Sequence, residues 1–223
     1  MTEAQPARSA PAAGLRLGFL GAGTMGGTIA AGLVAAGHEP GLIGVTSATP
    51  RTREELAARL GVRAFDSNAE AAAWADVVVL GVKPHAAAEL LEGVREQIGD
   101  GTLVISLCAG LSTAALEAHL VPGARVVRVM PNTPSAVGEG MAGISAGAEA
   151  TGDDLDVAAA LMGAVGRAVV IPESQQNALA SISGSGPAWV FHGIESLVEA
   201  AVAHARELIA QGADIIDVGG EST

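Results

Sequence analysis

Residues 15–26 read LRLGFLGAGTMG, and this stretch decides the fold of the chain. Its first half is a short apolar run typical of a buried strand, and residues 21–26 fit the pattern G-x-G-x-x-G. In that pattern Gly21 allows a tight turn, Gly23 lets a pyrophosphate approach the backbone, and Gly26 lets strand and helix pack closely. An ordinary strand–helix turn is the alternative, since the chain has 30 glycines. The position between a strand and a helix start favours a dinucleotide site, because helix-start amides attract phosphate.

Outward from this turn, short apolar runs alternate with helix-like stretches. Strands are expected at residues 15–20, 42–46, 76–82, 102–107, 125–130 and 167–172, with one more strand returning to the sheet edge after residue 130. Helices are expected at about 24–36, 53–60, 86–97, 112–120 and 153–166, and 174–211 is mostly helical with a break at 183–187. Strands joined by helices of this length form right-handed crossovers. The sequence therefore predicts an α/β fold, a Rossmann-type doubly wound and mostly parallel sheet followed by a helical region.

This pattern divides the chain into four parts. We expect a disordered Ala/Pro-rich tail at residues 1–14, a dinucleotide-binding domain at 15–172, the start of a helical domain at 173–203, and a segment of different character at 204–223. In the last part Gly212 is expected to end a helix, and the residues after it read as a strand.

Composition limits the partners. The formal net charge is −12, and nucleic acid or anionic lipid would require a basic surface. The sequence has no run approaching the ~20 apolar residues that span a bilayer. The first 14 residues lack the apolar core of a secretory signal, and the single Cys108 excludes an intrachain disulfide. The five histidines show no metal-ligand spacing, so we expect no metal, and a cytoplasmic location.

The end of the second expected strand indicates which cofactor is bound. Residues 45–53 read VTSATPRTR and contain no carboxylate, whereas an NAD-preferring site usually has one there for the ribose 2′-hydroxyl. Hydroxyl groups such as that of Ser47, together with Arg51 and Arg53, suit a 2′-phosphate. A solvated helix start is the alternative for the two arginines, although cations are unfavourable at that end of a helix. The sequence thus favours NADP(H).

The glycine turn is joined by four segments that resemble pyrroline-5-carboxylate reductase, the last enzyme of proline synthesis, over about residues 15–202. These segments are VVVLGVKP (77–84), VISLCAG (104–110), VVRVMPNTPSAVGEG (126–140) and SGSGPAW (183–189). MPNTP and SGSGPA are the most specific of them. Another NADP-linked reductase of the same fold would share the glycine turn but not this combination.

This resemblance implies roles for individual residues. The pyrophosphate would lie against residues 19–24, the 2′-phosphate would meet Ser47, and Asn68 would reach the adenosine half. Two turns, 81–84 and 107–109, would enclose the ribose and nicotinamide. The expected cofactor-binding residues are Phe19, Leu20, Gly21, Ala22, Gly23, Thr24, Met25, Gly26, Ser47, Arg51, Asn68, Gly81, Val82, Lys83, Pro84, Leu107, Cys108 and Ala109.

The implied reaction is hydride transfer from the nicotinamide to the C=N carbon of 1-pyrroline-5-carboxylate, which gives L-proline. A cyclic imine is basic enough to be substantially protonated near neutral pH, so the main task of the protein is to position two planar rings. Lys83 and Glu173 are the candidate catalytic residues. Plainer alternatives stay open, namely Asn68 as a helix cap, Glu173 as a surface residue and Cys108 as a small buried residue rather than a nucleophile.

The sequence departs from the family pattern in two places. Thr24 stands where the family more often has asparagine. The family's helical dimerisation domain, which begins at SGSGPA, is about twice as long as the part of this chain from that motif onward, and this argues against the family's homo-oligomer. Residues 204–223 read HARELIAQGADIIDVGGEST and resemble the N-terminal part of dihydropteroate synthase, as in a chimera or truncation. Impaired activity, or a catalytically inactive NADP-binding fragment, is therefore the alternative function.

Overall fold

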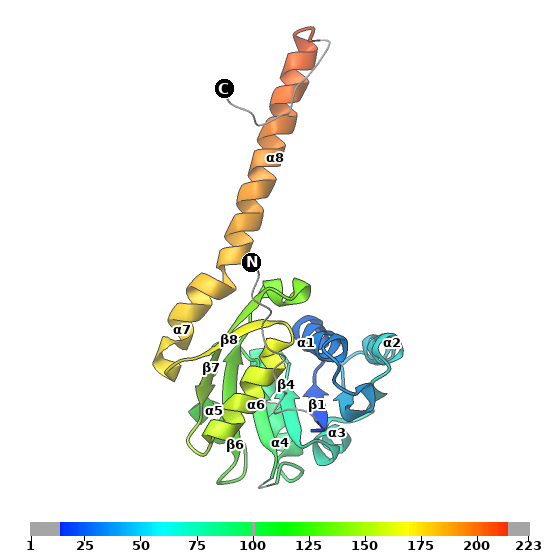
Figure 1. The fold of residues 1–223 in the computed structure, drawn as a ribbon, viewed down its shortest axis with the longest axis vertical. Coiled ribbons are helices and arrows are strands. Elements are labelled where there is room, and N and C mark those ends of the chain that lie inside the picture. The colour runs from blue at the N-terminus through cyan, green and yellow to red at the C-terminus, as the bar shows by residue number, and fades with distance from the viewer. Residues whose placement is uncertain (1–13, 100, 214–223) are drawn as a thin grey trace, which may run out of the picture. The chain divides into compact units, whose positions relative to one another are not determined.

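The computed structural model describes residues 14–99 and 101–213 of the chain. Contacts divide the chain into one unit that ends at Gly184 and a second that begins at Ser185. The first unit is a layered α/β structure with helices on both faces of a single sheet (Figure 1). The second unit contains one long helix, α8, which spans Gly186–Ala210.

The sheet of the first unit has eight strands in the order β3-β2-β1-β4-β5-β6-β7-β8. The strands are β1 Leu17–Leu20, β2 Ile43–Val45, β3 Arg63–Ala64, β4 Val77–Leu80, β5 Leu103–Ser106, β6 Arg125–Met130, β7 Gly140–Ala146 and β8 Gly166–Val170. Every neighbouring pair is parallel except β6 and β7, which are antiparallel. The predicted Rossmann-type, doubly wound and mostly parallel sheet is confirmed. Ligands of such folds bind beyond the carboxyl ends of the strands.

Helices cover both faces of this sheet. They are α1 Thr24–Ala35, α2 Pro50–Leu60, α3 Asn68–Trp74, α4 Pro84–Val94, α5 Thr113–Glu117, α6 Gly152–Gly163 and α7 Gln176–Leu179, with short helical turns η1 Pro40–Leu42, η2 Thr133–Val137 and η3 Glu173–Gln175. Alternate strand residues face two separate cores. Phe19 and Val79 pack with α1, α2 and α6, whereas Leu20 and Leu80 pack with α3, α4 and α5. Two covered faces explain why the strands are apolar throughout.

Several predicted boundaries are corrected. The region between α2 and β4 contains β3 and α3, which the sequence pattern missed because β3 has two residues and α3 is a short, alanine-rich helix. Helices α2 and α4 begin earlier than predicted, at Pro50 and Pro84, because proline suits the first turn of a helix. Strand β7 lies between β6 and β8, so the edge strand is β8 and not the returning strand.

Helix α8 has 25 residues and none of its side chains is buried. The expected break before it takes the form of a π-helical turn, η4, at Ala180–Gly184. Gly212 ends the helix as predicted: its φ is 91°, and the N–H groups of Gly212 and Ala213 donate to the carbonyls of Ile209 and Leu208. This is the Schellman arrangement. The predicted tail before Gly14 and the strand predicted after Gly212, from residue 214 onward, lie outside the described residues.

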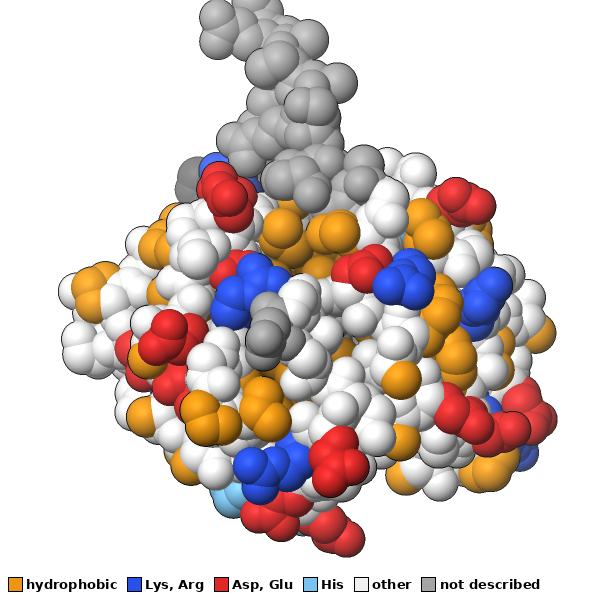
Figure 2. Space-filling view, turned by 90° about the horizontal axis from the view of Figure 1, so that it is seen from below, with side chains coloured by type: hydrophobic (Ala, Val, Ile, Leu, Met, Phe, Trp, Pro, Cys, Tyr) orange, Lys and Arg blue, Asp and Glu red, His pale blue; other side chains and the backbone are white. Residues whose placement is uncertain are grey.

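Charges of both signs are mixed on the face of the molecule shown in Figure 2, where acidic side chains lie among lysines and arginines. Among the helices of the described residues, none combines the length and the apolar character needed to cross a membrane.

Candidate functional site

The glycine turn connects the end of β1 to the start of α1. Gly21 has a φ of 81°, a left-handed conformation that favours glycine. Its N–H donates to Oγ1 of Thr46 (3.0 Å), and the N–H of Ala22 donates to the carbonyl oxygen of Thr46 (2.7 Å). The residue that follows β2 therefore fixes the turn that follows β1.

Gly23 faces open space. A Cβ built at Gly23 would meet no heavy atom within 4 Å, so packing inside the protein does not require glycine here. Gly23 and Thr24 line a cavity of about 930 Å³ that continues along α1 to Ser135 of η2. An open cradle beside helix-start amides fits the pyrophosphate of a dinucleotide, whose close approach a side chain would block.

The tight approach is made by Gly81 and not by Gly26. A Cβ at Gly81 would lie 2.9 Å from the carbonyl oxygen of Gly21, whereas one at Gly26 would lie 3.6 Å from the same oxygen, which is ordinary contact. The role that the sequence pattern gave to Gly26 is therefore corrected. Close packing joins the turn after β1 to the turn after β4, and it brings two of the predicted cofactor-binding segments together.

Thr46 links the glycine turn to Asn68. The hydroxyl of Thr46 is buried and donates to Oδ1 of Asn68 (2.6 Å). Asn68 is the first residue of α3, but the cap of that helix is Ser67, whose side chain accepts from the N–H of Glu70. The alternative role of Asn68 as the helix cap is therefore wrong. Since its oxygen is engaged by Thr46, the amide nitrogen of Asn68 is the group suited to donate to a ligand.

The two arginines near the end of β2 differ. Arg51 lies in the first turn of α2 with an exposed side chain that pairs with Glu55 (2.7 Å). The side chain of Arg53 is largely buried and donates to the carbonyl oxygen of Phe65 (3.1 Å) and to Asp66 (2.8 Å). Arg53 is thus committed to the loop after β3, and the sequence-based pairing of both arginines with a 2′-phosphate is corrected. Arg51 remains suited to that role, because a surface ion pair is exchanged at little cost.

Lys83 does not close a buried strand. Strand β4 ends at Leu80, and Lys83 is the N-cap residue of α4 with an exposed side chain. Its carbonyl oxygen accepts from the N–H of Ala86 (2.9 Å), and Pro84 occupies the first turn of the helix. The parts of this turn that lie against the glycine turn are the backbone at Gly81 and both the backbone and the side chain of Val82.

The turn after β5 packs against the turn after β4. The N–H of Leu107 donates to the carbonyl oxygen of Leu80 (3.0 Å), and the thiol of Cys108 lies 3.4 Å from the carbonyl oxygen of Val82. Burial raises the pKa of the Cys108 thiol, which favours the unreactive protonated form. This agrees with Cys108 as a small buried residue, while its neighbour Ala109 is exposed.

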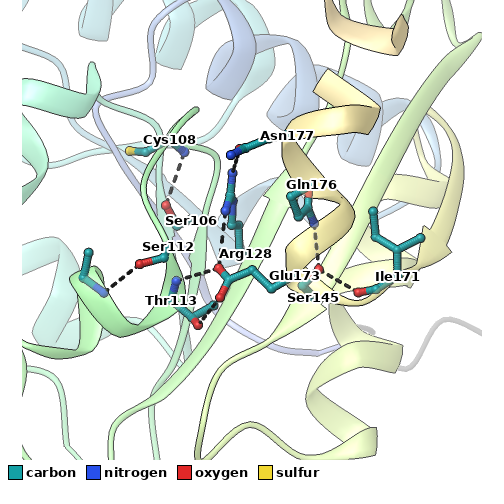
Figure 3. Close-up of polar contacts among 11 residues, drawn as sticks. Ser106, Cys108, Ser112, Thr113, Arg128, Ser145, Ile171, Glu173, Gln176 and Asn177 are labelled. Carbon is teal, nitrogen blue, oxygen red and sulfur yellow. Dashed lines mark hydrogen bonds and ion pairs between the residues drawn. The ribbon is translucent and has the colours of Figure 1, made fainter. Parts of the chain in front are cut away.

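Glu173 is bound by groups from two elements, α5 and β6 (Figure 3). Its carboxylate accepts from the N–H and the hydroxyl of Thr113, at 2.7 and 2.9 Å, and lies 3.4 Å from Nη1 of Arg128. Arg128 is buried in β6, and its Nη2 also donates to Asn177 (3.3 Å). The alternative of a free surface residue is therefore wrong for Glu173, because its carboxylate holds the start of α5.

The two most distinctive sequence segments meet in the structure. Asn132 of MPNTP is buried, and its Nδ2 donates to the carbonyl oxygen (3.2 Å) and hydroxyl (3.0 Å) of Ser183 in SGSGPA. Its Oδ1 accepts from the N–H of Met141 at the start of β7 (2.8 Å). Sequence reasoning missed Asn132, Ser183, Thr46 and Arg128. The available signal was a polar residue inside an otherwise apolar strand run, as in RVVRVM.

Fold and site together define a dinucleotide-binding protein of the Rossmann type. Three turns, after β1, β4 and β5, converge at the carboxyl edge of the sheet, with Thr46 and Asn68 beside them. A family model described as NADP oxidoreductase, coenzyme F420-dependent, matches residues 16–110.

Similar proteins identify the particular family. A pyrroline-5-carboxylate reductase of Methanosarcina acetivorans is 39% identical over 188 residues, which are 84% of this chain and 70% of the relative. A solved pyrroline-5-carboxylate reductase of Coxiella burnetii is 37% identical with a TM-score of 0.79, covering 85% of this chain and 71% of the other. The Plasmodium falciparum enzyme, solved with NADP bound, is 30% identical with a TM-score of 0.78, covering 86% and 70%. The chain belongs to the pyrroline-5-carboxylate reductase family.

Proposed function

We propose that this chain binds NADPH and reduces 1-pyrroline-5-carboxylate to L-proline. Family membership supports the reaction. The structural observation that carries the proposal is the convergence of three turns at the carboxyl edge of the sheet, beside Gly23, which faces open space. When bound, NADPH supplies the hydride that is added to the C=N carbon.

The residues around the cradle fit the two ends of the cofactor. Amides at the start of α1 would hold the pyrophosphate, with Gly23 leaving room for it. Ser47 and Arg51 would bind the 2′-phosphate, and Asn68 would donate to the adenosine half. The expected set of cofactor-binding residues from Phe19 to Ala109 thus divides into an adenosine side, supported by β2 and α3, and a nicotinamide side, formed by turns 81–84 and 107–109.

The protein positions reactants rather than supplying a strong acid. A substantial fraction of the cyclic imine is already protonated near neutral pH, so hydride addition needs alignment of the two rings more than proton donation. Neither catalytic candidate is placed as an acid: the side chain of Lys83 is exposed, and the carboxylate of Glu173 is occupied by Thr113 and Arg128. We therefore propose that Lys83 contributes through the backbone of its turn and Glu173 through the shape of the site.

Two measurements test this function. NADPH fluorescence should titrate to saturation with the chain, and proline should drive reduction of NADP⁺ at alkaline pH. Saturable binding without turnover would favour the inactive cofactor-binding alternative, and absence of binding would contradict both. Turnover with a different substrate but not with proline would point to another NADP-linked reductase.

We also propose that residues 204–223 derive from a different coding sequence, related to dihydropteroate synthase. The support is the sequence GADIIDVGGEST, of which the structure describes only the first two residues. The intact mass of the protein in its native cell tests the proposal. A mass that excludes this segment would contradict it.

A further inference from the structure

A row of polar side chains crosses the sheet beneath the site. Ser106 of β5, Arg128 of β6 and Ser145 of β7 are paired in register and are all buried (Figure 3). The row is engaged by the segment that follows β8: Ser145 donates to the carbonyl oxygen of Ile171 (2.7 Å) and accepts from Gln176 (2.9 Å). This buried polar row therefore lies at the end of β5, next to the turn 107–109 that is proposed to contact the nicotinamide.

Arg128 is poorly compensated for a buried cation. Its side chain is 5% exposed, yet its contacts with Glu173 and Asn177 are 3.4 and 3.3 Å long, and its Nε has no partner among the described residues. A buried charge with weak partners is a cost to folding, and an apolar residue often serves stability as well. The fold alone therefore gives little reason for arginine at this position.

The same strand offers a contrast. Arg125, at the other end of β6, makes short contacts of 2.7 Å with Asp154 and with the carbonyl oxygen of Gly101. That pair joins β6 to α6, remote from the three turns. The Nε of Arg125 also has no partner among the described residues, so the two arginines differ in the lengths of their ion-pair contacts, 2.7 Å for Arg125 and 3.4 Å for Arg128.

The contacts of Arg128 lead to the nicotinamide side. Arg128 lies against Glu173, and Glu173 holds both the N–H and the hydroxyl of Thr113. Thr113 begins α5 and ends the turn that starts at Leu107. The two carboxylate oxygens of Glu173 accept separately, one from the N–H and the other from the hydroxyl of Thr113.

We propose that Arg128 is a positioning residue of this reductase: through Glu173 it sets the conformation of residues 107–113 against the nicotinamide half of NADPH. The proposal rests on the proposed function. In this proposal Glu173 connects Arg128 of the sheet to the turn at residues 107–113, and it does not donate a proton to the substrate.

The test compares Arg128→Met with Arg125→Met on the same strand. NADPH and adenosine 2′,5′-bisphosphate, which carries only the adenosine half, are titrated into each variant, and kcat and KM are measured. Arg128→Met should raise the Kd for NADPH about tenfold, leave the Kd for the bisphosphate unchanged and lower kcat roughly ten- to hundredfold, since misplacement of about 1 Å has effects of this size. Arg125→Met should lower thermal stability and leave both Kd values and kcat unchanged.

Two further measurements separate positioning from damage to the fold. In the ligand-free protein, amide hydrogen exchange over residues 107–116 should be faster in Arg128→Met than in Arg125→Met. Arg128→Lys should recover part of kcat, because it keeps the charge without the guanidinium fork. Adding Glu173→Gln to Arg128→Met should cause little further loss, because the two residues act in series.

The outcomes distinguish the two proposals. If the wild-type chain binds no NADPH, the proposed function fails and the role of Arg128 fails with it. If the wild type binds and turns over but Arg128→Met behaves like Arg125→Met, only the role of Arg128 is overturned. Equal weakening of NADPH and the bisphosphate would overturn it as well, because it would indicate general damage.

Discussion

The α/β unit and helix α8 are both rich in apolar residues but differ in what those residues contact. Strand residues such as Leu80 and Val104 are fully buried, whereas Trp189 and Leu197 of α8 are 75% and 72% exposed. Burial contributes about 25 cal/mol per Å² of apolar surface. The α/β unit therefore carries its own stability, and α8 gains little from burial. Apolar composition does not define a core, because a core also needs a covering face.

The largest expected effect tests this contrast directly. Leu80→Ala should destabilise the α/β unit by about 2–5 kcal/mol, because it opens a cavity in a packed core. Leu197→Ala should leave the unfolding midpoint of the α/β unit unchanged, since no buried contact is lost. Urea denaturation followed by circular dichroism measures both. If both variants lost a similar amount of unfolding free energy at low protein concentration, the contrast between the buried core and the exposed helix would be wrong.

A second expectation concerns Gly23, a position of the α/β unit whose backbone faces open space. Gly23→Val should leave the melting temperature nearly unchanged, because a Cβ there meets no heavy atom within 4 Å. It should weaken NADPH at least about a hundredfold, or roughly 2.7 kcal/mol, by filling the cradle. Gly81→Ala should instead lower the melting temperature, since its Cβ would lie 2.9 Å from the Gly21 oxygen. Calorimetry and NADPH titration separate these effects, and a Gly23→Val protein that binds normally would rule out the cradle.

Two neighbouring arginines repeat the contrast between exposed and buried on a smaller scale. Arg51→Ala should weaken NADPH about tenfold, or roughly 1.4 kcal/mol, and leave NADH unaffected, because only NADPH carries the 2′-phosphate. Arg53→Ala should lower stability by about 1 kcal/mol and leave the preference for NADPH over NADH intact, because Arg53 is held by Phe65 and Asp66. Titrations with both cofactors decide this. Equal losses for NADPH and NADH in Arg51→Ala would refute the assignment.

The smallest expected effect lies at the opposite end of the sheet. Arg16 bonds to Asp76 at 2.7 Å and lowers the pKa of that carboxyl, mainly through side-chain hydrogen bonding. Stability from a depressed carboxyl pKa is present above the unfolded-state pKa and is lost as the pH falls through the folded-state pKa. Asp76→Asn should therefore lower the melting temperature slightly at pH 7 and have no effect in strong acid. An equal loss at both pH values would show that the ion pair is not the cause.

Much of the fold was predictable because its determinants are local. Alternating apolar runs and helix-like stretches located β1, β4, β5 and β6, and the glycine turn located the start of α1. The two-residue β3 and the short α3 were not predictable, since neither is long enough to show a period. The candidate site was predicted as a set of segments, and the structure brings the turns after β1, β4 and β5 together at the carboxyl edge.

The sequence by itself determined the doubly wound fold, the glycine turn at residues 21–26 and the family, because these depend on short-range patterns of residue type. Only the tertiary structure decided which of two arginines stays exposed, that Gly81 and not Gly26 makes the close approach, and that Glu173 is held by Thr113 and Arg128. Each of these depends on groups far apart in the chain, and the distance between such groups is fixed by packing and not by their spacing in the sequence.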